Sequence, residues 1–377
     1  MNLRRTFSIL RKEFWHITRD RVTFFLVTLS PALVLISMGA AFSIEIRNVA
    51  IAVLDQDRSA LSRRYQAHLQ TMGDVQVEAE VPSFVELERG ILGGTFKGAV
   101  VIPPGFEADV RAGQGADVQV VVDGTDPSTA GHAIAHILGR TESFARQVAR
   151  QVLARAGGSP AALDPPVELR TRIWYNPGLK YTVGMIPALL AVSLTMPAIS
   201  ASLAISREHE WGTMEMLIAT PVGRAELVLG KLLPYIVSGL LSTLLCVGVA
   251  RYLFGVPLRG SLGLFLLLSA DFFWASLTIG LLLSVLVRSQ QVAMIGAFLL
   301  FLFPGFFLSG IFIPLSSMGI MKLEAYLMPT THYVLISRGI FLKGAGLAAL
   351  WPYAAALFGV GAAVAFFTVL VFQKRLA

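Results

Sequence analysis

Two short motifs in this sequence begin or end like enzyme sites, and neither is complete. His209-Glu210 begins like the HExxH zinc motif, but Thr213 stands where the second histidine ligand belongs. Gly230-Lys231 ends like a phosphate-binding loop, but Leu232 replaces the required serine or threonine and the first glycine is missing. We therefore expect no catalytic residue and no nucleotide hydrolysis by this chain.

His132 and His136 are four residues apart on a predicted helix, a spacing that can place two metal ligands on one face. The sequence places no third ligand near them, and structural metal sites need more than two. We therefore interpret the pair as part of a surface helix face and expect no metal or other cofactor on this chain.

Asp271 is the most unusual single residue. It lies ten residues into an apolar run, roughly 15 Å deep at a rise of 1.5 Å per residue. A carboxylate at that depth costs about 2.5–3.5 kcal/mol to insert, so it should face protein or water. One interpretation is a cavity residue or a proton-linked residue. The other is a structural partner of a cation or of hydroxyls, or a span that begins later and leaves the carboxylate shallow.

The composition of the whole chain is that of a membrane protein. Of its 377 residues, 55% are hydrophobic and only 15% are charged, and the mean hydropathy is +0.67. Between Glu45 and Lys180 there are 16 acidic and 14 basic residues, whereas the rest of the chain holds 8 acidic and 17 basic ones. The basic excess therefore belongs to membrane-flanking segments, and we expect a lipid bilayer and no nucleic acid as a partner.

Apolar runs long enough to cross a bilayer predict six transmembrane helices. They cover residues 22–44, 181–205, 230–254, 261–287, 290–313 and 350–372, followed by a tail at 373–377. Residues 1–21 carry six basic residues and an amphipathic helix pattern, which suits the inner membrane face. Residues 314–349 are too long for a turn, and we expect two short amphipathic or re-entrant helices there, broken at Pro329.

Residues 45–180 predict a small α/β domain, because short apolar strands alternate with helical patterns. The expected strands are 49–54, 75–81, 98–103, 118–122 and a returning strand at 169–175, and the expected helices are 59–71, 83–90, 106–112 and 129–156. The expected fold class is a polytopic α-helical membrane protein with six transmembrane helices and an α/β extracytoplasmic domain between helices 1 and 2.

Basic residues in the short segments predict the orientation. Twelve lie on the side of the two termini, and five lie in the short loops of the opposite side. The positive-inside rule therefore places both termini in the cytoplasm and residues 45–180 outside.

The charged stretch Ser206–Lys231 separates the second and third spans. Its helix formers and early carboxylates predict a helix over 207–218. Thr220 is the predicted N-cap of a second helix, with Pro221 as its first residue. A bare turn would need only a few residues. The stretch is therefore either a solvated loop or a docking element for a soluble partner.

Proline and glycine interrupt the second and fifth spans at Pro187, Pro197, Pro304 and Gly305. Such breaks can permit bending in a transporter, but they are also common in ordinary membrane helices. We treat these four residues as hinge candidates.

At Arg207-Glu-His-Glu-Trp-Gly-Thr-Met-Glu-Met-Leu, followed by Thr220-Pro-Val and Gly230-Lys231, the sequence resembles the ABC-2 family of transporter permeases. Other family-like segments follow in the expected order, including Lys12-Glu13 with Arg19-Asp20, Asp55-Gln-Asp57, Gly98–Pro103, Val122-Asp123-Gly124, Ser309-Gly310 and Arg338-Gly339. Those between the first two spans resemble the outer domain of the long bacterial subgroup, which includes multidrug-type exporters. His209 departs from the family pattern, and we attach no consequence to it.

The resemblance implies that residues 206–229 hold a coupling helix that docks on a separate ATPase subunit. The residues that would inherit this role are Arg207, Glu208, Glu210, Gly212, Thr213, Glu215 and Pro221. The resemblance also implies a second permease copy or a sister permease, a periplasmic adaptor protein, and ATP and Mg²⁺ bound by the partner ATPase rather than by this chain.

We therefore expect a permease subunit of an ABC exporter in the bacterial inner membrane. It would move an amphipathic, drug-like or lipid-like substrate outward along a path lined mainly by the second and fifth spans. Two alternatives remain. One is a membrane-anchored sensor or scaffold that uses the outer domain, and the other is an ion-coupled transporter that uses Asp271.

Overall fold

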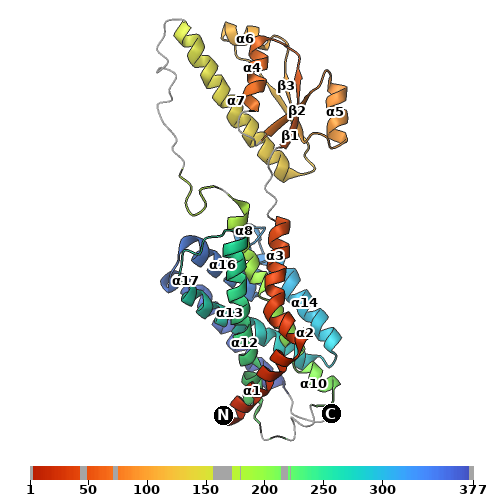
Figure 1. Ribbon diagram of the computed structural model, residues 1–377, viewed down its shortest axis with the longest axis vertical. Coiled ribbons are helices and arrows are strands. Elements are labelled where there is room, and N and C mark those ends of the chain that lie inside the picture. Colours follow the sequence, from red (N-terminus) through yellow and green to blue (C-terminus); the bar gives the residue numbers. More distant parts are fainter. Residues whose placement is uncertain are drawn as a thin grey trace. The chain divides into compact units, whose positions relative to one another are not determined.

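The computed structural model describes residues 3–42, 49–70, 75–155, 172–178, 180–213, 220 and 222–372 (Figure 1). The chain forms two compact units, and each is described by itself. The membrane unit comprises Met1–Ile44 and Arg172–Ala377, and the α/β unit comprises Glu45–Thr171.

All of the regular structure described in the membrane unit is helical. Its helices are α1 (Leu3–Arg19), α2 (Arg21–Phe24), α3 (Ser30–Phe42), α8 (Tyr181–Ser193), α9 (Met196–Ala201), α10 (Ser206–Glu210), α12 (Arg224–Gly248), α13 (Leu262–Leu286), α14 (Gln290–Phe307), α15 (Met321–Leu327), α16 (Pro329–Arg338) and α17 (Leu347–Val371). Wider π-helical turns at Phe25–Leu29, Val249–Leu253 and Gly339–Lys343 extend α2, α12 and α16, and Leu315–Ser317 is a 3-10 turn.

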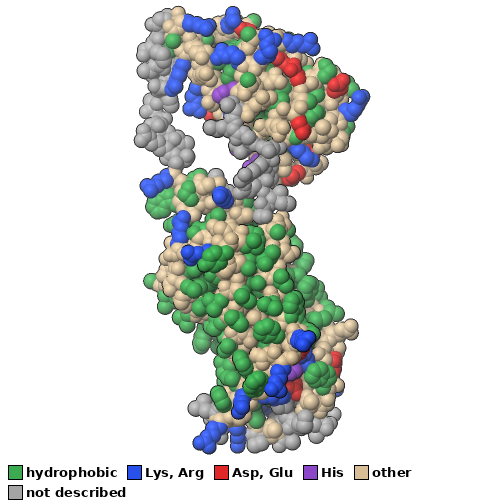
Figure 2. All heavy atoms as spheres, in the orientation of Figure 1, with side chains coloured by type: hydrophobic (Ala, Val, Ile, Leu, Met, Phe, Trp, Pro, Cys, Tyr) green, Lys and Arg blue, Asp and Glu red, His purple; other side chains and the backbone are tan. Residues whose placement is uncertain are grey.

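Within the described residues, six helical stretches are long and apolar enough to cross a bilayer, the number that the sequence predicts. They are Arg21–Phe42, Tyr181–Glu210, Arg224–Leu253, Leu262–Leu286, Gln290–Phe307 and Leu347–Val371. Figure 2 shows hydrophobic side chains over the middle of the membrane unit, with Lys and Arg side chains gathered towards its ends. This distribution suits a helix bundle whose middle contacts lipid and whose ends reach the headgroups.

The second span is divided into α8, α9 and α10. Pro187 lies inside α8 without ending it, whereas Pro197 stands in the first turn of α9, where a missing N–H costs least. A Cβ added at Gly280 of α13 would lie 2.3 Å from the carbonyl oxygen of Ala198. Glycine therefore lets α13 contact the backbone of α9 directly, which holds the divided span in place.

The segment after α14 contains two short helices separated at Pro329, as predicted. α16 is almost wholly buried, and its last turn bonds to backbone carbonyls of its neighbours. The Ser337 hydroxyl donates to the carbonyl of Pro187, and the Arg338 guanidinium donates to those of Gly184 (3.2 Å) and Gly310 (3.1 Å). α16 is therefore part of the bundle rather than a surface loop. Pro304 lies inside α14, and the backbone of Gly305 packs against Thr330 of α16.

The α/β unit contains β1 (Val49–Asp55), α4 (Ala60–Leu69), β2 (Val75–Glu80), α5 (Phe84–Leu92), β3 (Gly98–Ile102), α6 (Phe106–Ala112), β4 (Gln119–Val122) and α7 (Pro127–Arg155). The strand order is β2-β1-β3-β4, with β1 parallel to β2 and β3, and β4 antiparallel to β3. The predicted alternation of strands and helices is confirmed. The returning strand at 169–175 is wrong where it can be assessed, because residues 172–175 form no strand and 169–171 lie outside the described residues.

Both faces of this sheet carry an apolar cluster. α4, α6 and α7 cover one face, and α5 covers the other (Figure 1). The Ser59 hydroxyl oxygen accepts the Ser62 N–H (3.0 Å) and begins α4, and Ser83 caps α5 in the same way through Glu86. Serine caps after β1 and β2 therefore start the helices that follow these two strands.

Candidate functional site

Residues 206–213 form a shorter helix than predicted. α10 ends at Glu210, and Gly212 has a φ of +69°, in the left-handed region that glycine tolerates at helix ends. The predicted helix over 207–218 is therefore wrong from Trp211 to Thr213. Glu215 lies outside the described residues.

The second predicted helix begins later than expected. α12 starts at Arg224, and the carboxylate of Glu226 accepts the N–H of Gly223 at 2.9 Å. This carboxylate closes the first turn as in a capping box. The predicted N-cap at Thr220 is therefore wrong, and Pro221, the predicted first residue, lies outside the described residues.

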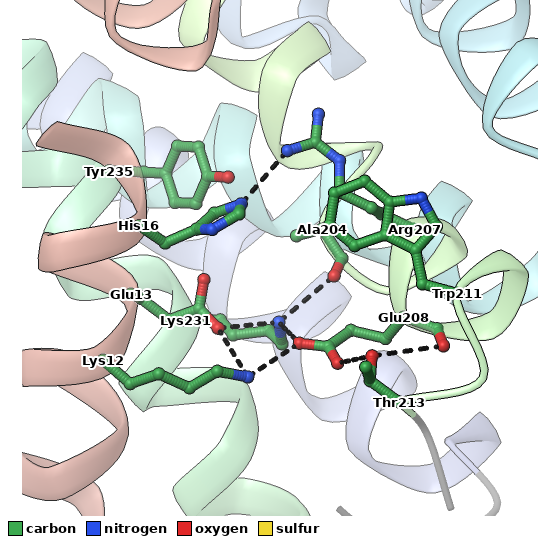
Figure 3. Close-up of a pocket in the computed structure, with 10 residues that line it drawn as sticks. All are labelled: Lys12, Glu13, His16, Ala204, Arg207, Glu208, Trp211, Thr213, Lys231 and Tyr235. Carbon is green, nitrogen blue, oxygen red and sulfur yellow. Dashed lines mark hydrogen bonds and ion pairs between the residues drawn. The ribbon is translucent and has the colours of Figure 1, made fainter. Parts of the chain in front are cut away.

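Lys231 is a buried cation at the centre of this region, with only 2% of its surface exposed. Its ammonium group donates to Glu13 at 2.9 Å and to Glu208 at 3.3 Å (Figure 3). It also donates to the backbone carbonyl of Ala204 at 3.1 Å, in the turn between α9 and α10. One side chain of α12 therefore binds both α1 and the end of the second span.

Glu208 is buried on the same side. Besides Lys231, its carboxylate accepts hydrogen bonds from the Lys12 ammonium at 3.0 Å and from the Thr213 hydroxyl. We call Lys12, Glu13, Glu208 and Lys231 the ion-pair network, in which every charge has an opposite charge within 4.0 Å. Glu208 thus faces the interior of the membrane unit.

Arg207 forms a second set of contacts beside the ion-pair network. Its guanidinium donates to Gln290 at 3.2 Å and to Asp20 at 3.4 Å, and it lies 5.5 Å from the Trp211 ring. A further contact joins it to Nε2 of His16 at 3.1 Å. An arginine can only donate, so Nε2 is the acceptor in this contact.

Asp20 ends α1 and begins α2. Partial burial would raise the pKa of Asp20, but hydrogen bonds from the Thr23 hydroxyl and the Val22 N–H, together with the charge of Arg207, outweigh it and hold that pKa below its usual value. Asp20 therefore stays ionised and available to Arg207.

α10 is also attached to the fourth and fifth spans. The Ser284 hydroxyl oxygen of α13 accepts the N–H groups of Ile205 (2.8 Å) and Ser206 (3.0 Å). Glu210 accepts the backbone N–H of Gln290 at 2.7 Å, at the start of α14. The Ser284 bonds satisfy N–H groups that the break before α10 leaves free, and the Glu210 bond satisfies an N–H group at the start of α14. α10 therefore contacts α1, α12, α13 and α14 through polar bonds.

Gly230 explains how α1 comes close enough to Lys231. A Cβ at this position would lie 2.8 Å from the branched Cβ of Ile9 and 3.4 Å from the carbonyl of Thr6. Only glycine allows this approach without movement. Gly230 and Lys231 therefore serve helix packing: Gly230 lets α1 approach, and Lys231 binds Glu13 of α1. Their place in the sequence is explained without phosphate binding.

These side chains surround a cavity of about 170 Å³. It is lined by Lys12, Glu13, His16, Ala204, Arg207, Glu208, Trp211, Thr213, Lys231 and Tyr235 (Figure 3). Its charged groups are mutually paired, so the arrangement is suited to holding helices in a fixed relation rather than to nucleophilic chemistry.

The other predicted residues lie apart from this cavity. Asp271 is half-buried in α13, and no described residue donates a hydrogen bond to it. His132 and His136 lie on α7, and the described residues contain no group of three or more potential metal ligands.

Sequence reasoning missed His16, Ser284 and Gln290, and it assigned no partner to Lys231. One signal was available: Thr6, Ile9, Glu13 and Ile17 recur at helical spacing and form the buried stripe of α1. A carboxylate on such a stripe needs a buried cation. The partner that supplies this cation lies 218 residues away, and spacing along α1 could not identify it.

Comparison with known proteins shows which family the chain is similar to along its length. The family described as "ABC-2 family transporter protein" matches residues 21–371. The probable multidrug ABC transporter permease YbhS of Escherichia coli is 32% identical over 91% of this chain and 90% of its own length. The inner membrane transport permease YhhJ of E. coli is 31% identical over 99% and 98%, and the probable multidrug ABC transporter permease YbhR is 26% identical over 92% of each. With a match that spans the bundle and the α/β unit alike, the chain belongs to the ABC-2 family of transporter proteins.

Proposed function

We propose that this chain is the membrane-spanning permease subunit of an ABC exporter, driven by a separate ATPase that docks at residues 206–229. Membership of the family implies an ABC ATPase partner. The observation that carries the docking site is the attachment of α10 to α1, α12, α13 and α14. A force applied beside α10 would reach four helices through short polar bonds.

The described side chains of residues 206–213 fall into two groups. Glu208 and Arg207 face inward and would hold α10 against its neighbours. His209 and Trp211 are exposed, and they are available to a partner. ATP and Mg²⁺ would be bound by that partner, in keeping with the incomplete phosphate-binding motif of this chain.

The proposed substrate is amphipathic, either drug-like or lipid-like, and the proposed direction is outward across the inner membrane. Support comes from two relatives, YbhS and YbhR, which are described as probable multidrug ABC transporter permeases. The path would lie between two permeases, lined by α14, which is mostly exposed; the second span, which the sequence also assigns to the path, is mostly buried within this chain and would support α14 from behind. A second copy or a sister permease and a periplasmic adaptor complete the proposed assembly.

The test of coupling uses the permease with its partner ATPase in proteoliposomes. Trp211→Ala combined with Glu215→Ala should abolish stimulation of ATP hydrolysis while the protein still inserts and purifies normally, because Trp211 is exposed and neither residue belongs to the ion-pair network. Glu324→Ala on α15 is the control, because it removes an exposed carboxylate from a distant helix. Wild-type transport by the double variant would refute the assignment.

The same preparation distinguishes an ion-coupled transporter. Efflux through an ABC exporter should stop when ATP is depleted and should continue when the proton gradient is collapsed. Efflux that follows the gradient, and that Asp271→Asn abolishes, would favour the ion-coupled alternative.

A further inference from the structure

The α/β unit contains a cavity of about 520 Å³ between α4, α6 and α7, the three helices on one face of its sheet (Figure 1). α6 contributes Phe106 and Val110, and the second half of α7 contributes Phe144, Val148 and Val152. Among the described residues that line the cavity, none is charged. Pockets for small molecules typically measure about 300–1,000 Å³ and are mostly apolar, so both volume and lining fit such a ligand.

The inner end of the cavity is aromatic and rigid. The Tyr65 ring lies 6.0 Å from that of Phe106 and 5.1 Å from that of Phe144, and all three side chains are buried. At the outer end, Val152 is 40% exposed. Among the described residues, the cavity is therefore open beside Val152 and closed by aromatic rings at its base, which gives a ligand a flat surface for stacking.

One polar group at the base has unused capacity. The Thr141 hydroxyl donates to the carbonyl of Ile137 at 2.7 Å, so its proton is committed. The 2.6 Å contact between the Tyr65 and Thr141 hydroxyl oxygens must then use the Tyr65 proton. The phenol oxygen of Tyr65 retains a lone pair that can accept from a ligand. Burial raises the pKa of Tyr65, so the group is a neutral acceptor.

We propose that this cavity binds a neutral, largely apolar small molecule that donates one hydrogen bond to Tyr65. An ionic ligand would lose its hydration and gain no opposite charge from the described lining. A protein surface would need roughly 800 Å² on each partner, which a single concave site does not offer. This inference goes beyond the proposed function, because binding requires neither the ATPase nor transport.

The test uses the purified full chain in lipid nanodiscs, without ATPase. Cys246 is the only cysteine in the sequence, so Cys246→Ala with Ala149→Cys gives one reactive thiol in the cavity lining. The probe is N-phenylnaphthylamine, a neutral two-part aromatic molecule with one N–H donor. At four times its dissociation constant, it should slow labelling of that thiol by a polar maleimide about fivefold.

Two matched controls accompany this measurement. Gln147 lies on the exposed side of the same helix, so the probe should not change the labelling of Gln147→Cys. Anilinonaphthalene sulfonate has the same rings with an added negative charge, and it should not protect position 149. Ala145→Cys, a second lining position, replaces Ala149→Cys if that variant does not fold.

Several outcomes would overturn the proposal. They are no protection at either lining position, equal protection at Gln147→Cys, and equal protection by the sulfonate. Protection that grows with protein concentration in the absence of probe would assign the surface to a second copy of the chain. Because the ATPase is absent, none of these results bears on coupling at residues 206–229.

Tyr65→Phe tests the hydrogen bond, because it removes the acceptor oxygen. This variant should weaken binding of N-phenylnaphthylamine about three- to tenfold, which corresponds to the loss of one neutral hydrogen bond. Phenylnaphthalene has no N–H, and its binding should stay the same in both proteins. If Tyr65→Phe weakens the two compounds equally, Tyr65 acts only as a packing residue and the donor requirement is wrong.

Discussion

Lys231 is a charged side chain that is almost completely buried. A buried ion pair gains little net stability, because desolvation offsets the attraction between the charges. Removing one partner of a buried ion pair is strongly destabilising, because the remaining charge then lacks an opposite charge. The main role of the ion-pair network is therefore to determine that α1, α10 and α12 pack together.

We predict that Lys231→Met destabilises the membrane unit by about 3–5 kcal/mol, because Glu13 and Glu208 lose their buried cation. Denaturant unfolding in detergent, followed by tryptophan fluorescence, measures the change. Combining Lys231→Met with Glu13→Gln should recover part of the loss, as expected for residues in contact. Equal stability of Lys231→Met and wild type would contradict the proposed role.

Asp57 in the α/β unit offers a prediction about pH. Its carboxylate accepts the N–H groups of Gly105 (2.9 Å) and Glu107 (3.1 Å) at the start of α6. A hydrogen bond from Ser59 and these backbone bonds lower the pKa of Asp57 below 3.8. A lowered pKa in the folded state stabilises the fold above the unfolded value, and this stability disappears as the pH falls through the folded value.

Asp57→Asn should therefore destabilise the α/β unit by about 0.3–1 kcal/mol at pH 7, because it removes a negative charge from the N-terminus of α6. The difference from wild type should shrink as the pH falls below about 4. Hydrogen exchange of peptides from β1 and β3 measures both effects. Asp117→Asn, an exposed change in the same unit, should have no effect, and a pH-independent loss in Asp57→Asn would show that its charge is not involved.

At the scale of the elements, the helices and strands that depend on nearby residues could be predicted, and the features that depend on distant residues could not. β1 to β4 and α4 to α7 agree closely with expectation, because serine caps and short apolar runs act within a few positions, whereas the returning strand at 169–175 is wrong where it can be assessed. The ends of α10 and α12 do not agree. The left-handed Gly212 and the carboxylate of Glu226 set those ends, and helix propensity alone pointed to Ile218 and Pro221. Contacts such as Lys231 with Glu13 depend on packing between distant helices, and no local pattern contains them.

Gly230 provides the prediction for element packing. Gly230→Ala should push α1 away from α12, because its Cβ would lie 2.8 Å from a branched side chain. We expect a loss of about 1–3 kcal/mol, as for other overpacked contacts. Gly248→Ala is the matched control in the same helix, since nothing lies within 4 Å of its added Cβ. Equal effects of the two substitutions would show that α1 does not depend on this close contact.

At the scale of the whole molecule, the orientation in the membrane is a prediction from charge alone. In a chain with Cys246→Ala, Gln114→Cys should react with an impermeant maleimide in intact spheroplasts. Ser8→Cys on α1 should react only after lysis. Both positions are exposed within their own units. The reverse pattern would place the termini outside and would remove residues 206–229 from the reach of a cytoplasmic ATPase.

The divided second span has a consequence for how the protein is made. The Ala204 carbonyl and the Ile205 and Ser206 N–H groups find their partners on the third and fourth spans, at Lys231 and Ser284. Lipid offers no substitute for these bonds. We therefore expect the second span to leave the insertion machinery together with the next two. Nascent chains truncated before Lys231 should remain crosslinked to the translocon, whereas chains extended beyond Ser284 should be released into the bilayer.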